Sequence, residues 1–154
     1  NNSSFKRMDF TKAIETFFAR YFDFKGRSSR AEYWWFYLFY VLVTIATLIV
    51  DVIFFGEAGV DEIPLSQSLW ALATFIGYVS LGIRRLHDID RTGYWLLSGI
   101  APLLLMILGI IIDNVVIFVI GILGVIGYAI TIFVFTLFPG TKGVNRFGEN
   151  PLDD

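Results

Sequence analysis

The sequence predicts an all-α fold, a four-helix transmembrane bundle preceded by an amphipathic interfacial helix. The first observation behind this prediction is composition: hydrophobic residues make up 56% of the 154 residues and charged residues 17%, whereas soluble domains carry roughly 25% charged residues. The second is the recurrence of apolar runs long enough to cross a hydrocarbon core of about 30 Å. The third is that every Lys and Arg lies outside those runs. A chain of this length accommodates a single domain.

The N-terminal part divides into two predicted segments. Residues 1–7, NNSSFKR, lack the apolar core of a signal peptide, and we interpret them as an expression scar ahead of Met8. Residues 8–30 are assigned to an N-terminal amphipathic helix and a loop, because apolar residues recur over 9–24 at the spacing of one helix face. This helix either lies in the plane of the lipid headgroups or packs its apolar face on the other helices, and the pattern leaves both interpretations open.

The transmembrane domain is predicted over residues 31–138, with spans at about 33–55, 65–83, 95–112 and 115–138. Ser29 and Glu32 have the spacing of a capping box, which starts the first helix at about Ala31. Within the spans only Asp51 is strongly ionisable. The second span is the weakest, because Ser, Thr and Gln residues interrupt its apolar run, but its length still meets the minimum for a crossing.

The last two spans share one apolar stretch that is too long for a single crossing. Asp113 and Asn114 are its only strongly polar pair, and both residue types favour turns, so a tight helical hairpin is predicted there. Pro102 is expected to kink the third span. At i+3 spacing in the fourth span lie Gly121, Gly124 and Gly127. Such a ridge favours a helix-packing seam over a pore lining, with a partner helix from the same chain or from another subunit.

The distribution of positive charge predicts the topology. The 12 basic residues divide into seven before the first span, three between the second and third, and two after the fourth. With four crossings all of them lie on one side, and the positive-inside rule makes that side cytoplasmic. We therefore expect a multi-pass protein of the cytoplasmic membrane with both termini in the cytoplasm. Residues 139–154 form a cytoplasmic tail, and its turn residues, together with Arg146 and Phe147, predict that it folds back on the cytoplasmic face.

Several functional classes find no support in the residue types present. The chain has no cysteine, which excludes disulfides, thiolate metal sites and cysteine nucleophiles. A net charge of -2 gives no indication of a nucleic-acid partner. The sequence contains no P-loop, HExxH or GxSxG motif. We therefore predict no cofactor, no metal site, no catalytic residue and no nucleic-acid partner.

The densest charge lies in residues 84–95, RRLHDIDRTGYW, which hold the only histidine of the chain. His87 with Asp88 and Asp90 offers a mixed set of metal ligands, but the neighbouring arginines repel a cation or pair with the aspartates. His87 as a general base is another hypothesis, although no nucleophile accompanies it. The arginines either bind phosphate groups at headgroup depth or are topogenic charge without binding specificity. Ion pairs that fold the segment are the preferred interpretation.

Three polar segments lie at the predicted cytoplasmic ends: FKGRSSRAEYWWF at 24–36, RRLHDIDRTGYW at 84–95 and PGTKGVNRFGENP at 139–151. Together they resemble the fingerprints of the domain of unknown function 805 family, YhaH-like small bacterial inner-membrane proteins, over essentially residues 8–151. The resemblance implies a four-span protein of the bacterial cytoplasmic (inner) membrane and supplies no reaction.

The leading hypothesis is a non-enzymatic integral membrane protein whose polar cytoplasmic face binds anionic lipid headgroups or a protein partner. The alternatives are a small oligomeric channel or transporter, with Arg84, Arg85 and His87 at its inner mouth, and a membrane-embedded enzyme that acts on lipid phosphates through His87 and the neighbouring aspartates. The candidate partners are membrane lipids, a second copy of the chain and another protein. The candidate polar cytoplasmic site consists of Arg27, Arg30, Glu32, Arg84, Arg85, His87, Asp88, Asp90, Arg91, Asn145 and Arg146.

Overall fold

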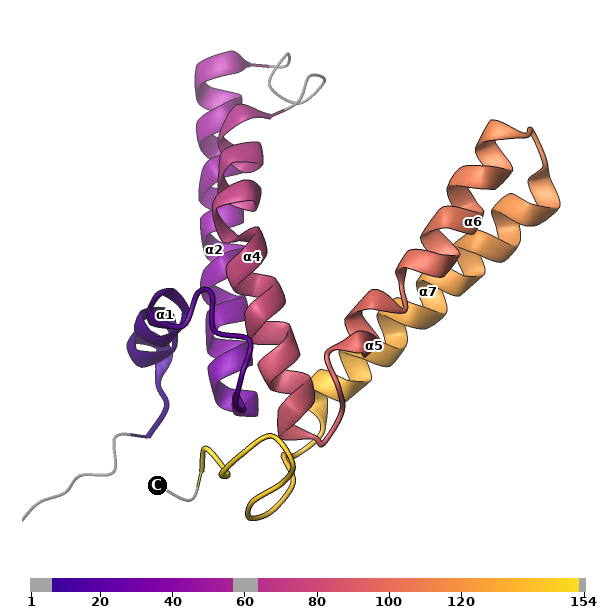
Figure 1. The fold of residues 1–154 in the computed structure, drawn as a ribbon. Coiled ribbons are helices and arrows are strands. Elements are labelled where there is room, and N and C mark those ends of the chain that lie inside the picture. Colours follow the sequence, from indigo (N-terminus) through magenta and orange to yellow (C-terminus); the bar gives the residue numbers. More distant parts are fainter. Residues whose placement is uncertain (1–6, 57–63, 153–154) are drawn as a thin grey trace, which may run out of the picture.

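The fold is helical in the computed structural model, which describes residues 7–56 and 64–152. A short N-terminal helix is followed by two antiparallel helical hairpins that meet at one end and diverge toward the other (Figure 1). The first hairpin pairs α2 with α4, and the second pairs α5 and α6 with α7. In chain order the helices are α1 (Phe10–Ala19), α2 (Arg30–Phe55), α4 (Leu65–Asp88), α5 (Tyr94–Leu97), α6 (Ile100–Ile111) and α7 (Val115–Leu137).

The all-α class is confirmed for the described residues, whereas the single four-helix bundle is not. The long helices form two divergent arms (Figure 1), and because lipid tails are as apolar as these side chains, no hydrophobic force draws the arms together. By length and composition three segments can cross a membrane: α2, the segment Tyr94–Ile111 made by α5 and α6, and α7. α4 is not among them, since polar residues in its first turn and basic residues in its last turn lower its apolar content.

Two helix boundaries differ from the predicted ones and affect the site. α1 ends at Ala19, and residues 20–29 form turns and a loop. α4 continues to Asp88, past the predicted end of the second span at about residue 83, so Arg84 and Arg85 belong to its last turns. Basic residues near the end of a helix interact favourably with its dipole, which helps to explain the extension. Most of the predicted expression scar, residues 1–6, lies outside the described residues.

The apolar face of α1 packs against the first hairpin. Phe17 is buried and its ring stacks on Phe36 of α2 with the centroids 3.6 Å apart. Leu81 of α4 completes this small core. Phe18, the next residue, stays 50% exposed. Packing on the other helices is thus observed, and a position in the headgroup plane stays a prediction.

Local sequence signals predict the turn of the second hairpin correctly. Asp113 has a φ of 51°, and the side chain of Asn114 caps α7 by accepting a hydrogen bond from the backbone N–H of Ile117 at 3.1 Å. Between α5 and α6 the helix is interrupted at residues 98–99, one turn before Pro102. Proline lacks the N–H that would bond to the carbonyl of residue 98. The predicted turn is confirmed, and the predicted kink takes the form of a break in the helix.

Asp51 is buried in the half of α2 that lies far from the junction of the hairpins. Its carboxylate accepts hydrogen bonds from the backbone N–H groups of Ser66 and Gln67 at 3.1 and 3.3 Å. These amides belong to the first turn of α4, where no intrahelical acceptor exists. Asp51 therefore caps α4 from the neighbouring helix, and this pairing offsets the cost of a carboxylate among apolar side chains.

The glycine ridge of α7 packs against α6 of the same chain. A Cβ added at Gly121 would overlap the backbone of Met106, and one added at Gly109 of α6 would overlap the backbone of Phe118. Gly127 has no such neighbour within 4 Å. The sequence left the partner of the ridge open, and for Gly121 the partner is the chain's own α6.

We expect Gly121→Ala to destabilise the second hairpin by about 1–3 kcal/mol, because the added methyl group forces two closely packed helices apart. Unfolding would be followed by tryptophan fluorescence in mixed micelles with an increasing fraction of sodium dodecyl sulfate. Gly127→Ala is the matched control, and it should leave the unfolding midpoint unchanged or slightly higher, since alanine favours a helix over glycine. Equal midpoints for the two variants would contradict the close contact at Gly121.

Candidate functional site

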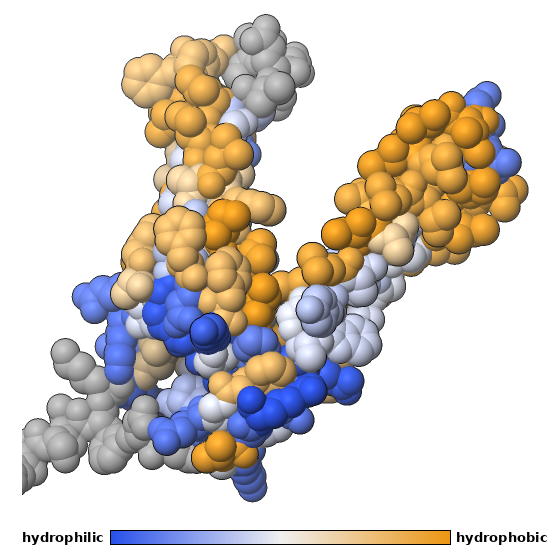
Figure 2. Space-filling model, viewed as in Figure 1, coloured by the Kyte–Doolittle hydropathy of each residue, from blue (hydrophilic) through white to orange (hydrophobic). Residues whose placement is uncertain are grey.

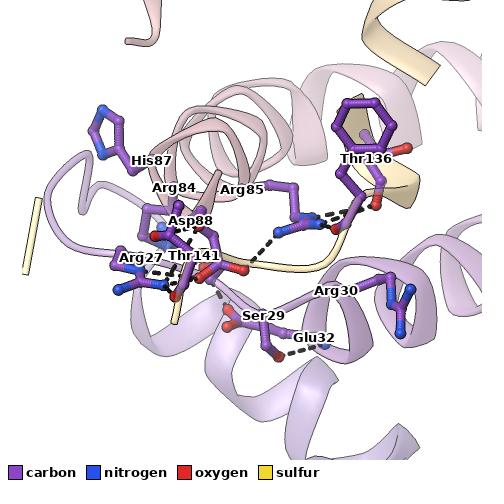
Figure 3. A network of polar contacts seen from close by, with 12 residues as sticks. Arg27, Ser29, Arg30, Glu32, Arg84, Arg85, His87, Asp88, Thr136 and Thr141 are labelled. Atoms are coloured by element: carbon purple, nitrogen blue, oxygen red, sulfur yellow. Dashed lines mark hydrogen bonds and ion pairs between the residues drawn. The ribbon is translucent and has the colours of Figure 1, made fainter. Parts of the chain in front are cut away.

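Charged side chains from the start of α2, the end of α4 and the loop before α2 gather where the two hairpins join (Figure 3). They are buried although they are ionisable, and Arg84, Arg85 and Asp88 are each at most 1% exposed. Burying a charge is costly unless it is paired and hydrogen-bonded, so the partners of each group decide what the cluster can do. We name the following residues the polar hub: Arg27, Glu32, Arg84, Arg85, His87 and Asp88.

Asp88 lies at the centre of the polar hub and pairs with two arginines. Its Oδ1 is 2.9 Å from Nη2 of Arg27, and its Oδ2 accepts a hydrogen bond from Nη1 of Arg85 at 2.6 Å. Burial raises the pKa of Asp88, and the positive charges of Arg85 and Arg27 oppose that rise. Two guanidinium groups at this distance favour the ionised form of the carboxyl group. Asp88 thereby links the loop before α2 to the end of α4.

Arg27 also binds the C-terminal tail. It donates hydrogen bonds to the carbonyl of Thr141 at 2.6 Å and to the carbonyl of Gly143 at 2.7 Å. The N–H of Thr141 in turn donates to the carbonyl of Asp88 at 2.8 Å. Gly140 passes so close to the carboxylate of Asp88 that a Cβ would overlap it. The tail therefore folds back on the polar hub, as predicted, over its described residues up to 152.

Arg85 joins the two hairpins. Its Nε and Nη2 atoms both donate to the carbonyl of Thr136 at 3.3 Å, and Nη2 also donates to the carbonyl of Phe138. These carbonyls lie at the end of α7, where the last helical carbonyls lack intrahelical donors. A cation at a helix C-terminus is also electrostatically favourable. Arg85 thus provides hydrogen-bond donors for the last carbonyls of α7 and holds the end of α7 against α4.

Arg84 fixes the loop between α1 and α2. Its guanidinium group donates to the carbonyls of Arg20 and Asp23 at 2.9 and 2.6 Å, and to Oγ of Ser28 at 2.9 Å. Nη2 lies 3.5 Å from Oε1 of Glu32, which makes a loose ion pair without a good hydrogen bond. Burial lowers the pKa of Arg84.

The predicted capping box at the start of α2 is half present. Oγ of Ser29 accepts a hydrogen bond from the backbone N–H of Glu32 at 3.1 Å, as the spacing predicts. The carboxylate of Glu32 faces Arg84. The cap therefore orients Glu32 toward the interior of the polar hub.

His87 makes the contacts of a structural group. Its ring stacks on Phe147 of the tail with the centroids 3.9 Å apart, and Nδ1 lies 2.9 Å from the carbonyl of Gly26. Asn145 donates to the carbonyl of His87 at 2.9 Å. Burial lowers the pKa of His87, so the neutral imidazole is favoured near neutral pH. Within the described residues no group of three or more His, Cys, Asp or Glu side chains is arranged to hold a metal ion.

The other predicted site residues lie around the polar hub. Arg146 pairs with Asp90 at 3.0 Å, with both side chains about half exposed. Arg91 lies over the ring of Trp95, 5.5 Å from its centroid. Arg30 is exposed and points away from the hub network (Figure 3), and its Nη1 donates to the carbonyl of Leu137 at 3.2 Å. The structure thus separates a buried group of arginines from an exposed one.

A groove runs between the start of α2 and the end of α7. Its volume is about 530 Å³, and it is lined by Arg30, Ala31, Trp34, Phe133 and Leu137. Sequence reasoning included Arg30 but missed the groove, because the lining comes from two helices that are far apart in the chain. It also missed Ser28, Thr136 and Thr141, whose positions within or beside the three polar segments were the available signal.

Comparisons with known proteins identify the same family that the three polar segments resemble. A family model described as a protein of unknown function (DUF805) matches residues 21–149. The chain is 34% identical to the inner membrane protein YhaI of Escherichia coli strain K12, over 85% of this chain and 87% of YhaI. It is 30% identical to the inner membrane protein YhaH of the same strain, over 85% of this chain and 88% of YhaH. No solved structure matches the chain. The matched range includes the whole polar hub, and the chain belongs to the DUF805 family.

Proposed function

We propose that this chain is a non-enzymatic inner-membrane protein that crosses the membrane four times and binds anionic phospholipid headgroups at its cytoplasmic face. The observation that carries the proposal is that the arginines fall into a buried group and an exposed group. Those of the polar hub are engaged by protein acceptors, whereas Arg30 and Arg91 are exposed around it. Polar surface lies where the hairpins join and the arms are apolar (Figure 2), which suits a protein whose arms are in lipid and whose basic end meets headgroups.

The contacts of the tail support an even number of crossings. Arg27 precedes α2 and hydrogen-bonds to Gly143 of the tail at 2.7 Å, so the segments before the first hairpin and after the second lie on the same side. If α2, the segment made by α5 and α6, and α7 each cross the membrane once, an even number of crossings requires that α4 crosses as well. α4 has 24 residues, which at 1.5 Å per residue is about 36 Å and exceeds the hydrocarbon core. The positive-inside rule then makes the shared side cytoplasmic.

The topology can be tested with single cysteines, because the chain has none of its own. We expect cysteines at Glu15 of α1 and at Val144 of the tail to react with a membrane-impermeant maleimide in inverted vesicles and not in intact spheroplasts. Both positions are exposed in the structure. Reaction of the two cysteines from opposite sides would exclude four crossings.

Lipid binding can be tested on the purified protein. We expect phosphatidylglycerol or cardiolipin to be enriched over phosphatidylethanolamine among the retained lipids identified by mass spectrometry, compared with the membrane of origin. A retained fraction with the same composition as the membrane would contradict headgroup binding.

A further inference from the structure

We propose that the groove between α2 and α7 binds one anionic phospholipid, with the headgroup phosphate on Arg30 and an acyl chain along Trp34 and Phe133. This inference rests on the proposed function and assigns it to a site. The groove lies where the two hairpins begin to diverge, and it is lined by Arg30, Ala31, Trp34, Phe133 and Leu137. The groove is shallow and open on one side, with a volume of about 530 Å³.

The lining of the groove matches an amphipathic anion. Four of its five residues are apolar and the fifth is an arginine. The apolar wall is held in place by protein contacts, because Nε1 of Trp34 donates to the carbonyl of Thr136 at 3.2 Å and its ring meets Phe133 edge to face at 5.9 Å. A site that is already ordered loses less entropy when a ligand binds.

Arg30 is available to a ligand in a way that the arginines of the polar hub are not. Within residues 7–56 and 64–152, Arg27, Arg84 and Arg85 each have a carboxylate at ion-pair distance, whereas Arg30 has none. Among the described residues its guanidinium group donates one hydrogen bond, to the carbonyl of Leu137, which leaves other N–H donors for a phosphate. Arginine binds phosphate with two parallel hydrogen bonds, which a lysine cannot reproduce.

The polar hub adds to the attraction for an anion. Its three buried arginines face two buried carboxylates, Glu32 and Asp88, so one positive charge is uncompensated when both acids are ionised. Arg85 and Arg30 donate to neighbouring carbonyls at the end of α7, those of Thr136 and Leu137, so the two cations lie near each other. An anion bound to Arg30 would therefore also relieve repulsion between two neighbouring cations.

A phospholipid fits this groove better than a free phosphate because of where its polar end lies. Arg30 is the first residue of α2, and Trp34 follows one turn farther along the helix that leads into the apolar arm. Tryptophan side chains are enriched at the boundary between headgroups and hydrocarbon. The cation is thus at headgroup depth, and the apolar wall extends toward the acyl region.

The test uses the full chain in phosphatidylcholine nanodiscs, titrated with phosphatidylglycerol and read by native mass spectrometry of protein–lipid complexes. Arg30→Gln should weaken phosphatidylglycerol binding about tenfold, which is about 1.4 kcal/mol, and Ala31→Phe should weaken it by filling the groove without changing charge. Lys142→Gln is the control, since it removes an exposed cation of the tail at the same end of the molecule, and it should bind like the wild type.

The outcomes separate the site from the function. If the wild type binds phosphatidylglycerol and all three variants bind equally well, the groove is wrong while headgroup binding stands. If the wild type shows no preference for phosphatidylglycerol over phosphatidylcholine, the proposed function fails and the groove with it. Inorganic phosphate that displaces the lipid at equal concentration would overturn the acyl part of the proposal. The unfolding midpoint of each variant, compared with that of the wild type, shows whether a loss of binding is a loss of fold.

Discussion

Replacing Asp88 by asparagine is expected to destabilise the protein by about 3–5 kcal/mol, because it breaks two buried ion pairs and leaves both cations without an anion. Arg27 and Arg85 would remain buried beside an amide that offers one acceptor oxygen where the carboxylate offers two. The substitution hardly changes side-chain volume, so the loss reports charge and hydrogen bonding. The unfolding midpoint in mixed micelles with sodium dodecyl sulfate measures it.

Asp90→Asn is the matched control for this change. Asp90 pairs with Arg146 at 3.0 Å, but the two side chains are 46% and 57% exposed, and exposed ion pairs contribute less than about 1 kcal/mol. The backbone of Asp90 has a φ of 59°, a conformation that asparagine tolerates. Equal destabilisation by the two variants would contradict the central role of Asp88.

Asp88→Asn should also release the C-terminal tail from the polar hub. Arg27 is held by Asp88 and donates to the carbonyls of Thr141 and Gly143. Loss of the carboxylate therefore weakens the hydrogen bonds between Arg27 and the tail. Trypsin should then cleave after the exposed Lys142 faster than in the wild type, under conditions where the helices are intact. In Asp90→Asn, cleavage after Lys142 should be unchanged.

Features with a local cause were predictable from the sequence. The turn at Asp113 and Asn114 follows from two residue types that favour turns, and the break before Pro102 follows from a missing N–H. The capping role of Ser29 was read from its spacing to Glu32. The return of the tail was inferred from its turn residues. In each case the cause lies within a few residues of the effect.

The arrangement of the polar hub has no local cause. Arg84 and Arg85 turn inward because α4 continues to Asp88, beyond the predicted end of the second span at about residue 83. Most acceptors of Arg27 and Arg84 are backbone carbonyls. Every residue has a backbone carbonyl, so the residue types in the sequence do not predict these hydrogen bonds. The divergence of the hairpins also depends on lipid as solvent, which weakens the forces between separate helix pairs.

The burial of these arginines changes how the positive charge is interpreted. A purely topogenic arginine needs only to remain on the cytoplasmic side, and nothing in that role requires partners. Arg85 instead ties the end of α7 to α4, and Arg84 ties the loop after α1 to both helices of the first hairpin. The same residues can set the orientation and close the fold, whereas the exposed Arg30 is the residue of the proposed lipid site.

Arg84→Lys is expected to destabilise the protein by about 3 kcal/mol although it keeps the charge. The guanidinium group serves the carbonyls of Arg20 and Asp23 and the hydroxyl of Ser28 at the same time. A lysine ammonium has three donors on one atom and cannot span these positions, and each buried acceptor left unpaired costs about 1–3 kcal/mol. Unfolding in mixed micelles measures the loss, with the exposed Arg146→Lys as the control of the same chemical type.

Glu32→Gln separates geometry from charge in the same cluster. Its ion pair with Arg84 is already loose at 3.5 Å, and Arg84 keeps its other acceptors when the charge is removed. Glu32→Gln should therefore cost less than Arg84→Lys. If charge balance alone stabilised the cluster, the order would reverse, because lysine preserves the ion pair and glutamine abolishes it. An Arg84→Lys variant as stable as Arg146→Lys would show that the charge, and not the shape of the guanidinium group, holds the loop between α1 and α2.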